Sequence, residues 1–372
     1  MSFAVFTPQL GSVSETFIRR HIDDLMVQPA VVVTGRFVAA AGNARRSQPT
    51  LFLDAWARRL SVRLARRAGA REAGMRDATV ARFLRHHGVT QVLGEYLHYF
   101  ADFVPLLERM GTPYIVQGHG IDVSAELRKP GMAQKYQVYR SAAAVLTRCE
   151  FHRRRLIDIG LPAGLVHVNP GGVDVPRAPP RREPAACRRF LAIGRMVPKK
   201  GPIYLLEAFR QAAAQDAQIT LDYVGSGELF AAAEQFVDAC GLRQRVRLHG
   251  AAPEELKVRL LQECGVFVQH SITDPATGDE EGLPASIQEA MAHGLAVIAT
   301  RHSGIAEAVA QNETGWLVAE GDVAGMAREM LAAAANPQRT LAAGLAGHGR
   351  ALALYQWGDE KVRLLSFLEQ GP

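Results

Sequence analysis

Short apolar runs alternate with longer segments of helical periodicity along most of this chain. Runs of strand length occupy residues 30–34, 90–93, 114–116, 143–147, 190–193, 219–224, 246–248, 266–269 and 295–300. Strands that alternate with helices are typical of βαβ units, in which each helix carries the chain back to start the next parallel strand. The pattern therefore predicts an α/β protein with parallel sheets.

The clearest succession lies between residues 266 and 318. The run at 266–269 ends in a polar loop that contains glycine. Pro284 is predicted to open a helix, because its missing N–H costs nothing in the first turn, and Gly294 is predicted to end it. A strand at 295–300 and a helix after Gly304 follow. Such short spacing implies parallel strands, so the loop before Pro284 is predicted to face a ligand crevice.

Two carboxylates lie eight positions apart in this stretch, Glu281 in the loop and Glu289 in the predicted helix. Such a pair can bind two hydroxyl-bearing rings, and the helix N-terminus between them offers unpaired N–H groups to a diphosphate. Taken alone, two glutamates at this spacing are more often a solvated helix face.

The N-terminal part begins with a predicted strand, a loop that contains Gly11, and a helix with Ser14 as its N-cap. It lacks G-x-G-x-x-G, which argues against a nicotinamide-dependent dehydrogenase. Gly11 either lets a phosphate approach the backbone closely or forms an ordinary turn. His119 follows another predicted strand and lies between Gly118 and Gly120, which favours exposure in a crevice over the more common structural role of a lone histidine.

A segment rich in proline and arginine, residues 176–186, is predicted to link two domains. After the strand at 190–193, Arg195 and Lys200 stand five positions apart on a loop that enters a helix. One forked and one point-like cation suit a diphosphate, although a basic loop is usually only solvated.

Several motifs together resemble the retaining nucleotide-sugar glycosyltransferases of family GT4. The order of acidic loop, Glu-Gly-Leu-Pro, helix with Glu289, Gly294 and Gly304 is similar to the E-x7-E signature of that family, and the loop with Arg195 and Lys200 resembles its donor site. The loop QGHGIDVS around His119 and the opening SETFI resemble members that make bacterial surface polysaccharides, such as the colanic-acid type.

The resemblance implies the GT-B architecture, two Rossmann-like domains that face each other across a cleft, with a C-terminal crossover helix. It places an acceptor-binding domain at residues 1–175, the linker at 176–186, and a donor-binding domain at 187–354. Residues 355–372 are expected to form the helix that returns to the first domain.

The resemblance also implies roles for single residues. Glu281 would bind hydroxyls of the donor sugar, Glu289 the ribose, and the backbone of Gly282 and Leu283 the sugar or phosphate. The implied donor-binding residues are Gly11, Arg195, Lys200, Glu281, Gly282, Leu283, Pro284 and Glu289. Ser14, Glu15 and His119 are the implied acceptor-binding residues, and His119 and Glu281 the implied catalytic ones.

The implied reaction is transfer of a sugar, with retention, from a nucleoside-diphosphate sugar to a lipid-linked or growing exopolysaccharide acceptor. The sequence contains no D-x-D pair, so no metal and no further cofactor are expected. The residue that assists the chemical step stays unassigned. A nucleotide-sugar 2-epimerase of GT-B architecture is the alternative, and it would need no acceptor. A silent sugar-nucleotide-binding subunit is a third reading, against which the retained Arg195, Lys200 and both glutamates argue.

Composition limits the remaining possibilities. With 372 residues, of which 48% are hydrophobic and 22% charged, the chain suits two globular domains. No apolar run approaches the length of a membrane span, and the N-terminus lacks the features of a signal peptide, so a cytoplasmic protein is expected. The four cysteines are scattered and are expected to be buried free thiols. No nucleic-acid partner is expected.

The net charge of +6 is unevenly placed. Between Arg36 and Arg85 twelve arginines stand against three acidic residues. Leu53, Trp56 and the leucines that follow lie at helical spacing among these arginines, which predicts a basic amphipathic helix. Residues 53–85 either bind an anionic membrane surface, which would make the protein peripheral at the inner face of the membrane, or form a helix with a solvated arginine-rich face.

Overall fold

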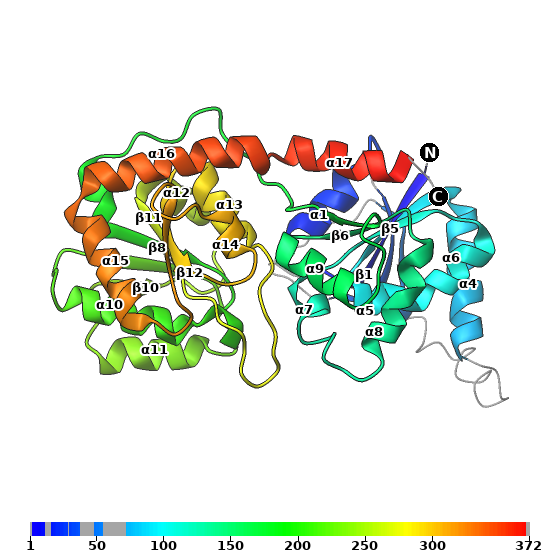
Figure 1. Ribbon diagram of the computed structural model, residues 1–372, viewed down its shortest axis with the longest axis horizontal. Coiled ribbons are helices and arrows are strands. Elements are labelled where there is room, and N and C mark those ends of the chain that lie inside the picture. Colours follow the sequence, from blue (N-terminus) through cyan, green and yellow to red (C-terminus); the bar gives the residue numbers. More distant parts are fainter. Residues whose placement is uncertain (1, 12–15, 29, 38–47, 55–71, 370–372) are drawn as a thin grey trace. The chain divides into compact units, whose positions relative to one another are not determined.

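The chain folds into two compact units. The computed structural model describes residues 2–11, 16–28, 30–37, 48–54 and 72–369. The first unit comprises Met1–Thr147, Arg153–Asn169 and Lys361–Pro372, and the second comprises Arg148–His152 and Pro170–Glu360. Each unit has its own parallel sheet and its own helices (Figure 1).

The first unit is built on a seven-stranded sheet in the order β3-β2-β1-β4-β5-β6-β7. All of its strand pairs are parallel. The strands are β1 (Ser2–Leu10), β2 (Val31–Phe37), β3 (Thr50–Phe52), β4 (Val89–Glu95), β5 (Tyr114–Gln117), β6 (Ala144–Thr147) and β7 (Val166–Val168).

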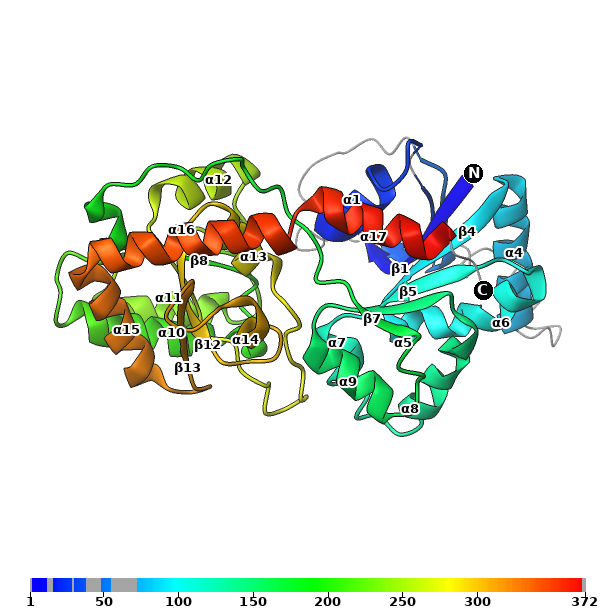
Figure 2. The same ribbon diagram turned by 45° about the horizontal axis from the view of Figure 1, so that its top comes forward.

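Apolar clusters cover both faces of this sheet. Phe6 of β1 packs on one face with α4, α5 and α6, while Phe3 and Val5 pack on the other with α1 and with Leu364 of α17. The views in Figures 1 and 2 agree that α17 lies beside α1 in this unit. The helices are α1 (Thr16–Asp23), α4 (Glu72–His86), α5 (Leu97–Phe100), α6 (Val104–Met110), α7 (Gly120–Val123), α8 (Met132–Lys135), α9 (Glu150–Asp158) and α17 (Trp357–Glu369).

The second unit repeats this plan with a six-stranded parallel sheet in the order β10-β9-β8-β11-β12-β13. Alternate residues of β8 show that both faces are buried, because Phe190 and Ala192 pack with α10, α11 and α15, and Leu191 packs with α12, α13 and α16. The strands are β8 (Arg189–Ile193), β9 (Thr220–Val224), β10 (Val246–Leu248), β11 (Val266–Gln269), β12 (Ala296–Thr300) and β13 (Gly315–Val318).

Helices of the second unit lie in two layers around this sheet (Figure 2). They are α10 (Pro202–Ala213), α11 (Phe230–Ala239), α12 (Glu254–Glu263), α13 (Ala285–Ala292), α14 (Ile305–Ala308), α15 (Val323–Ala335) and α16 (Pro337–Leu354). Two short 3₁₀ turns, η3 (Pro184–Arg188) and η4 (Pro198–Lys200), flank β8.

Both sheets change winding direction at their third strand. In the first sheet the reversal falls between β1 and β4, and in the second between β8 and β11. Ligands of doubly wound sheets bind beyond the carboxyl ends of the strands at such a switch point. The loops after β1, β4, β8 and β11 are therefore the first places to look for a site.

The nine apolar runs singled out in the sequence all form strands, so the predicted α/β class with parallel sheets is confirmed. The helix predicted to start at Pro284 starts one residue later. Pro284 itself has an extended backbone and serves as the N-cap of α13. Gly294 ends that helix with φ of 73°, as predicted. The N-cap predicted at Ser14 and most of the basic helix predicted from Leu53 onward lie outside the described residues.

The proline- and arginine-rich segment at 176–186 is hydrogen-bonded to the rest of the second unit through Arg182. The Arg182 guanidinium donates hydrogen bonds to the carbonyl oxygens of Leu261, Cys264 and His293 at 2.5–2.7 Å.

The four cysteines are free thiols, three of them buried and Cys240 half-buried. No helix within the described ranges is both long and apolar enough to cross a membrane.

Candidate functional site

Two loops meet at the switch point of the second sheet, residues 194–201 after β8 and residues 270–284 after β11. The first contains the turn η4 and the second contains the acidic run Asp279–Glu281. Gly201 brings them together, because it has φ of 51° and a Cβ at this position would lie 2.1 Å from the carbonyl oxygen of His270. Only glycine allows this contact without displacing one loop.

Two lysines of the first loop bind Glu281 of the second. Lys200 Nζ lies 3.1 Å from Glu281 Oε2, and Lys199 Nζ lies 3.5 Å from Glu281 Oε1 and 2.9 Å from Asp279 Oδ2. Lys199 Nζ also donates to the carbonyl oxygen of Glu280 at 3.2 Å. The Glu281 side chain is 11% exposed, so this carboxylate depends on the two ammonium groups for its charge balance.

The charges of this cluster are strongly coupled. Burial by itself raises the pKa of the Glu281 carboxyl, but Lys200 and Lys199 outweigh it and lower that pKa to about 2. Burial lowers the pKa of Lys200, and Glu281 only partly compensates. Burial acts in the same direction on Lys199, yet Glu281 and Asp279 together raise its pKa. Glu281 is therefore an anion at neutral pH.

The backbone of Glu281 is held separately by a histidine. The Glu281 N–H donates to His302 Nε2 at 3.1 Å, and His302 Nδ1 lies 2.6 Å from Glu320 Oε1. A ring nitrogen that accepts the Glu281 N–H carries no hydrogen, so Nδ1 is the atom that donates to Glu320. The His302 side chain is buried and holds the loop through the backbone of Glu281, separately from the two lysines.

The predicted segment from Gly282 to Pro284 leads directly into α13. A Cβ at Gly304 would lie 2.9 Å from the carbonyl oxygen of Gly282, so the loop after β12 packs closely on this turn. Leu283 is buried in the core, and α13 begins after Pro284 without a side-chain cap among the described residues. The first N–H groups of the helix therefore remain suited to an anion.

Glu289 lies in α13, and its carboxylate binds Lys257 of α12 at 3.0 Å. Lys257 also binds Glu254 at 2.8 Å. Burial would lower the pKa of Lys257, but Glu289 and Glu254 raise it. Arg195 is exposed beside the cluster, and its charge contributes to the lowered pKa of Glu281. All four charged residues predicted for the donor side thus lie on loops or helices of the second unit.

A second polar cluster occupies the first unit, at the ends of β4 and β5. Glu95 is completely buried, with Oε1 2.5 Å from His21 Nδ1 and Oε2 2.8 Å from His119 Nε2. Burial would raise the pKa of Glu95, but His21 and His119 lower it to about 2. The rings of Phe17 and Tyr96 lie against the His119 ring at centroid distances of 4.8 and 4.4 Å.

Asp122 fixes the backbone on which His119 stands. Its Oδ2 accepts the His119 N–H at 2.8 Å, and its Oδ1 contacts His98 Nδ1 at 2.7 Å. His119 is the N-cap of α7, and its side chain is 12% exposed.

Gly11 has φ of 97°, so it occupies a conformation that favours glycine. The predicted acceptor residues Ser14 and Glu15 lie outside the described residues.

Several residues of these clusters were missed from the sequence. Lys199, Glu95 and His302 each contact a predicted site residue. Lys199 is adjacent to Lys200, and the sequence alone does not indicate that the two lysines have different contacts. The sequence does offer one indication for Glu95. A carboxylate that follows apolar residues at the end of a strand needs a buried partner.

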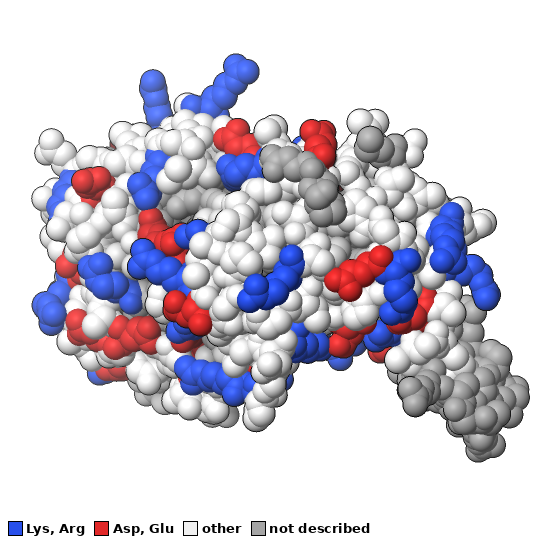
Figure 3. Space-filling view, turned by 45° about the vertical axis from the view of Figure 1, so that its right-hand side comes forward, with Lys and Arg blue, Asp and Glu red and all other residues white. Residues whose placement is uncertain are grey.

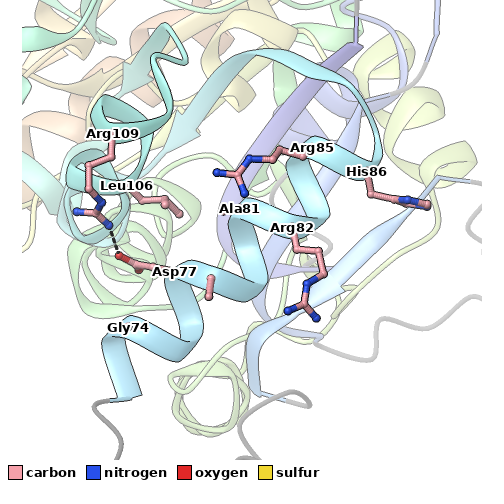
Figure 4. A pocket seen from close by; sticks show the side chains of 9 residues that line it. Gly74, Asp77, Ala81, Arg82, Arg85, His86, Leu106 and Arg109 are labelled. Carbon is pink, nitrogen blue, oxygen red and sulfur yellow. Dashed lines mark hydrogen bonds and ion pairs between the residues drawn. The ribbon is translucent and has the colours of Figure 1, made fainter.

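A surface groove in the first unit contains none of the predicted site residues. It lies between α4 and α6 and is lined by Asp77, Arg82, Arg85 and Arg109 among others (Figure 4). Arg109 binds Asp77 at 2.8 Å.

On the face drawn in Figure 3, basic and acidic side chains of the described residues are interspersed. Within the described ranges, no group of three or more His, Cys, Asp or Glu residues is arranged to hold a metal ion.

Two doubly wound units, with a cationic and carboxylate cluster at a switch point, define a fold of the GT-B class. The solved structure of Anabaena Alr3699/HepE in complex with UDP-glucose is similar over 100% of both chains, with a TM-score of 0.77 and 17% sequence identity. Residues 181–346 match the family described as glycosyl transferases group 1. This part of the chain is a glycosyl transferases group 1 domain.

Curated relatives carry glycosyltransferase names. The putative colanic acid biosynthesis glycosyltransferase WcaL of Escherichia coli (strain K12) is 32% identical over 217 residues, which cover 58% of this chain and 53% of that protein. The GDP-mannose-dependent alpha-(1-6)-phosphatidylinositol monomannoside mannosyltransferase of Mycolicibacterium smegmatis (strain ATCC 700084 / mc(2)155) is 27% identical over 275 residues, 71% of this chain and 72% of that protein. The chain thus spans about half the length of the first of these relatives.

Proposed function

We propose that this protein transfers a hexose from a nucleoside-diphosphate sugar to a saccharide or lipid-linked acceptor in the synthesis of a surface polysaccharide. The observation that carries the proposal is the contact of Lys199 and Lys200 with Glu281 at the switch point of a glycosyl transferases group 1 domain. Lys200, a cation for a diphosphate, and Glu281, an ionised acceptor for sugar hydroxyls, lie side by side there.

Each part of the donor then has a partner. Lys200 and Arg195 bind the diphosphate, aided by the N-terminus of α13, and Glu281 with the backbone of Gly282 and Leu283 binds the sugar. Glu289 binds the ribose. In the reaction the bond between the anomeric carbon and the phosphate oxygen breaks, and a bond to the acceptor hydroxyl forms. The hydroxyl proton passes to the leaving phosphate, whose charge the cations stabilise without a metal.

The first unit supplies the acceptor side. His119, fixed by Glu95 and Asp122, orients the reacting groups, and Ser14 and Glu15 bind the acceptor. Transfer occurs with retention of the anomeric configuration. One relative is named for colanic acid biosynthesis and another as a phosphatidylinositol monomannoside mannosyltransferase, and these names support a polysaccharide or lipid-linked acceptor.

Acceptor-dependent turnover tests the proposal. Purified protein is incubated with UDP-glucose or GDP-mannose, each with and without a membrane fraction that contains lipid-linked saccharide. Release of UDP or GDP is followed together with the anomeric coupling constant of the product. The expected result is nucleotide release that needs an acceptor and a product with the anomeric configuration of the donor.

Two outcomes would overturn it. Conversion of the sugar nucleotide to its 2-epimer without an acceptor would make the protein an isomerase. Tight binding of both donors without any turnover, with every acceptor fraction, would make it a binding subunit. Lys200→Ala serves as the internal control, because loss of a charge-assisted phosphate contact should cost about 1.5–3 kcal/mol of donor binding.

A further inference from the structure

Lys199 joins the two donor-side loops more extensively than Lys200 does. Its ammonium group contacts Asp279, the Glu280 carbonyl and Glu281, three consecutive residues of the acidic run, at 2.9, 3.2 and 3.5 Å. Its side chain is 11% exposed, so these contacts replace most of its hydration. Lys199 is thus part of the loop after β8 in sequence, but its ammonium group contacts the loop after β11.

Lys200 stands in a different position. Its ion pair is with Glu281 Oε2 at 3.1 Å, and together with Arg195 it is a cation that the proposed function assigns to the donor diphosphate. The Glu281 carboxylate therefore binds the same ammonium group that the proposed diphosphate needs. Carboxylate and diphosphate compete for one cation, and each carries negative charge.

When Lys200 binds diphosphate, the buried Glu281 carboxylate loses a partner, and Lys199 can compensate for that loss. If Lys200 turns to the diphosphate, Glu281 keeps a buried negative charge, and a buried charge without a partner is strongly destabilising. Lys199 already contacts the other carboxylate oxygen, and Asp279 and the Glu280 carbonyl hold it in place. Its ammonium group can take over Glu281 while Lys200 binds phosphate.

We propose that Lys199 is a positioning residue that retains Glu281 when Lys200 passes to the donor diphosphate. The inference rests on the proposed function, because it requires that a nucleoside diphosphate binds beside Lys200. Lys199 acts through Glu281 and does not itself bind phosphate. Its loss therefore matters only while residue 281 carries a negative charge.

A double-mutant cycle tests this dependence. UDP and GDP are titrated calorimetrically into the wild type, Lys199→Met, Glu281→Gln and the double variant. Lys199→Met is expected to weaken binding of the preferred nucleotide about tenfold, because Glu281 then holds Lys200, and Glu281→Gln is expected to strengthen it several-fold. In the Glu281→Gln background, Lys199→Met should change the affinity by less than about twofold.

The pattern of these affinities decides the matter. An equal loss from Lys199→Met in both backgrounds would mean that Lys199 binds phosphate directly, which overturns its positioning role and leaves the proposed function standing. No loss in the wild-type background would also overturn that role. If the wild type binds neither nucleotide, the proposed function fails and this inference fails with it.

Two further variants separate positioning from folding and from general charge. Lys199→Arg keeps the cation and its contacts to the acidic run, so it should restore affinity to within about threefold of the wild type. Arg210→Met removes a cation from α10, the helix that follows this loop, where Arg210 is paired with Glu207 at 2.7 Å. That variant should leave the affinity unchanged, and a tenfold loss there would show that any lost cation suffices.

Discussion

The Glu281 carboxylate and the Glu289 carboxylate differ in their surroundings although both are paired with lysine. Glu281 is buried between two ammonium groups and its pKa falls to about 2, whereas Glu289 shares one lysine with Glu254 on the flank of α13. The proposed partners of the two carboxylates also differ, the sugar for Glu281 and the ribose for Glu289. Substitution should therefore separate them.

Glu281→Gln should abolish most transfer while free nucleoside diphosphate still binds, because the lost partner is the sugar. Glu289→Gln should weaken the free nucleotide itself, by about 1.5–3 kcal/mol if one charge-assisted hydrogen bond is lost. Calorimetry with UDP or GDP and a turnover assay measure the two effects. Equal losses of nucleotide affinity in both variants would mean that the assignment of the two rings is wrong.

His270 gives the second unit a measurable pH dependence. Its Nε2 accepts the Gly321 N–H at 2.9 Å, so the ring is neutral when this bond is made. Burial lowers the pKa of His270 from 6.5 to about 4, although Asp322 and Glu320 act in the opposite direction. Between pH 6.5 and about pH 4 the unfolded chain therefore binds a proton that the folded protein does not.

The free energy of unfolding should consequently fall as the pH drops from about 6.5 to about 4, by about 3 kcal/mol from this residue. Above pH 6.5 the contribution is fully present. Urea unfolding at pH 7, 5.5 and 4.5, followed by tryptophan fluorescence, measures it. His270→Gln keeps an acceptor for the Gly321 N–H but cannot be protonated, so the difference between the two proteins should shrink with falling pH. A difference that is constant across this range would contradict the prediction.

Single residues also mark the limit of what the sequence could predict. Most strands were predicted because their apolar runs do not depend on partners elsewhere in the chain, but β13, although fully buried, was not. The contacts of Glu95 with His119 and His21 span 24 and 74 positions and depend on the tertiary fold. Thr50–Phe52 was not predicted as a strand because β3 has only three residues, and because Leu53, which continues its apolar run, fits the helical spacing of the segment that follows.

At the scale of elements, the donor side depends on how closely the turn before α10 approaches the end of β11. Gly201 has φ of 51°, and a Cβ there would lie 2.1 Å from a carbonyl oxygen of the neighbouring loop. Gly241, at the end of α11, has φ of 67° and nothing within 4 Å of such a Cβ. The two glycines share a backbone conformation and differ in their surroundings.

Gly241→Ala should therefore cost only the left-handed backbone penalty, about 1–2 kcal/mol of stability, and leave nucleotide affinity unchanged. Gly201→Ala carries the same penalty and also displaces Lys199 and Lys200 from Glu281, so it should lower nucleotide affinity at least about tenfold. Thermal unfolding and calorimetry measure the two effects. If both variants bind nucleotide equally well, the close approach at Gly201 does not position the site.

At the scale of the whole molecule, positive charge is concentrated between residues 36 and 85 of the N-terminal half. The arginines between Arg36 and Arg85 outnumber acidic residues by nine, and two of them, Arg82 and Arg85 of α4, line the groove in Figure 4. Basic residues near an anionic lipid surface contribute about 1 kcal/mol each and are screened by salt. Membrane binding through residues 53–85 is thus a prediction with a defined salt dependence.

The protein should float with anionic liposomes at low salt, be released as salt rises, and bind neutral liposomes poorly. Joint replacement of Arg58, Arg59, Arg66 and Arg67 by glutamine should abolish flotation and lower activity on a membrane acceptor. Activity on a short soluble acceptor should persist, because the proposed donor residues belong to the other unit. Flotation that ignores these substitutions would leave the segment as a solvated helix face.

The first unit is assembled from both ends of the chain, and this affects how it forms during translation. Leu364 and Leu368 of α17 pack in one cluster with Phe3 and Val5 of β1. At ribosomal rates of about 5–20 residues per second, β1 waits roughly 20–70 s for that helix. The second unit, which ends at Glu360, emerges complete before the first. Until α17 has been synthesised, only part of this apolar face can be covered, by Ile18 and Ile22 of α1.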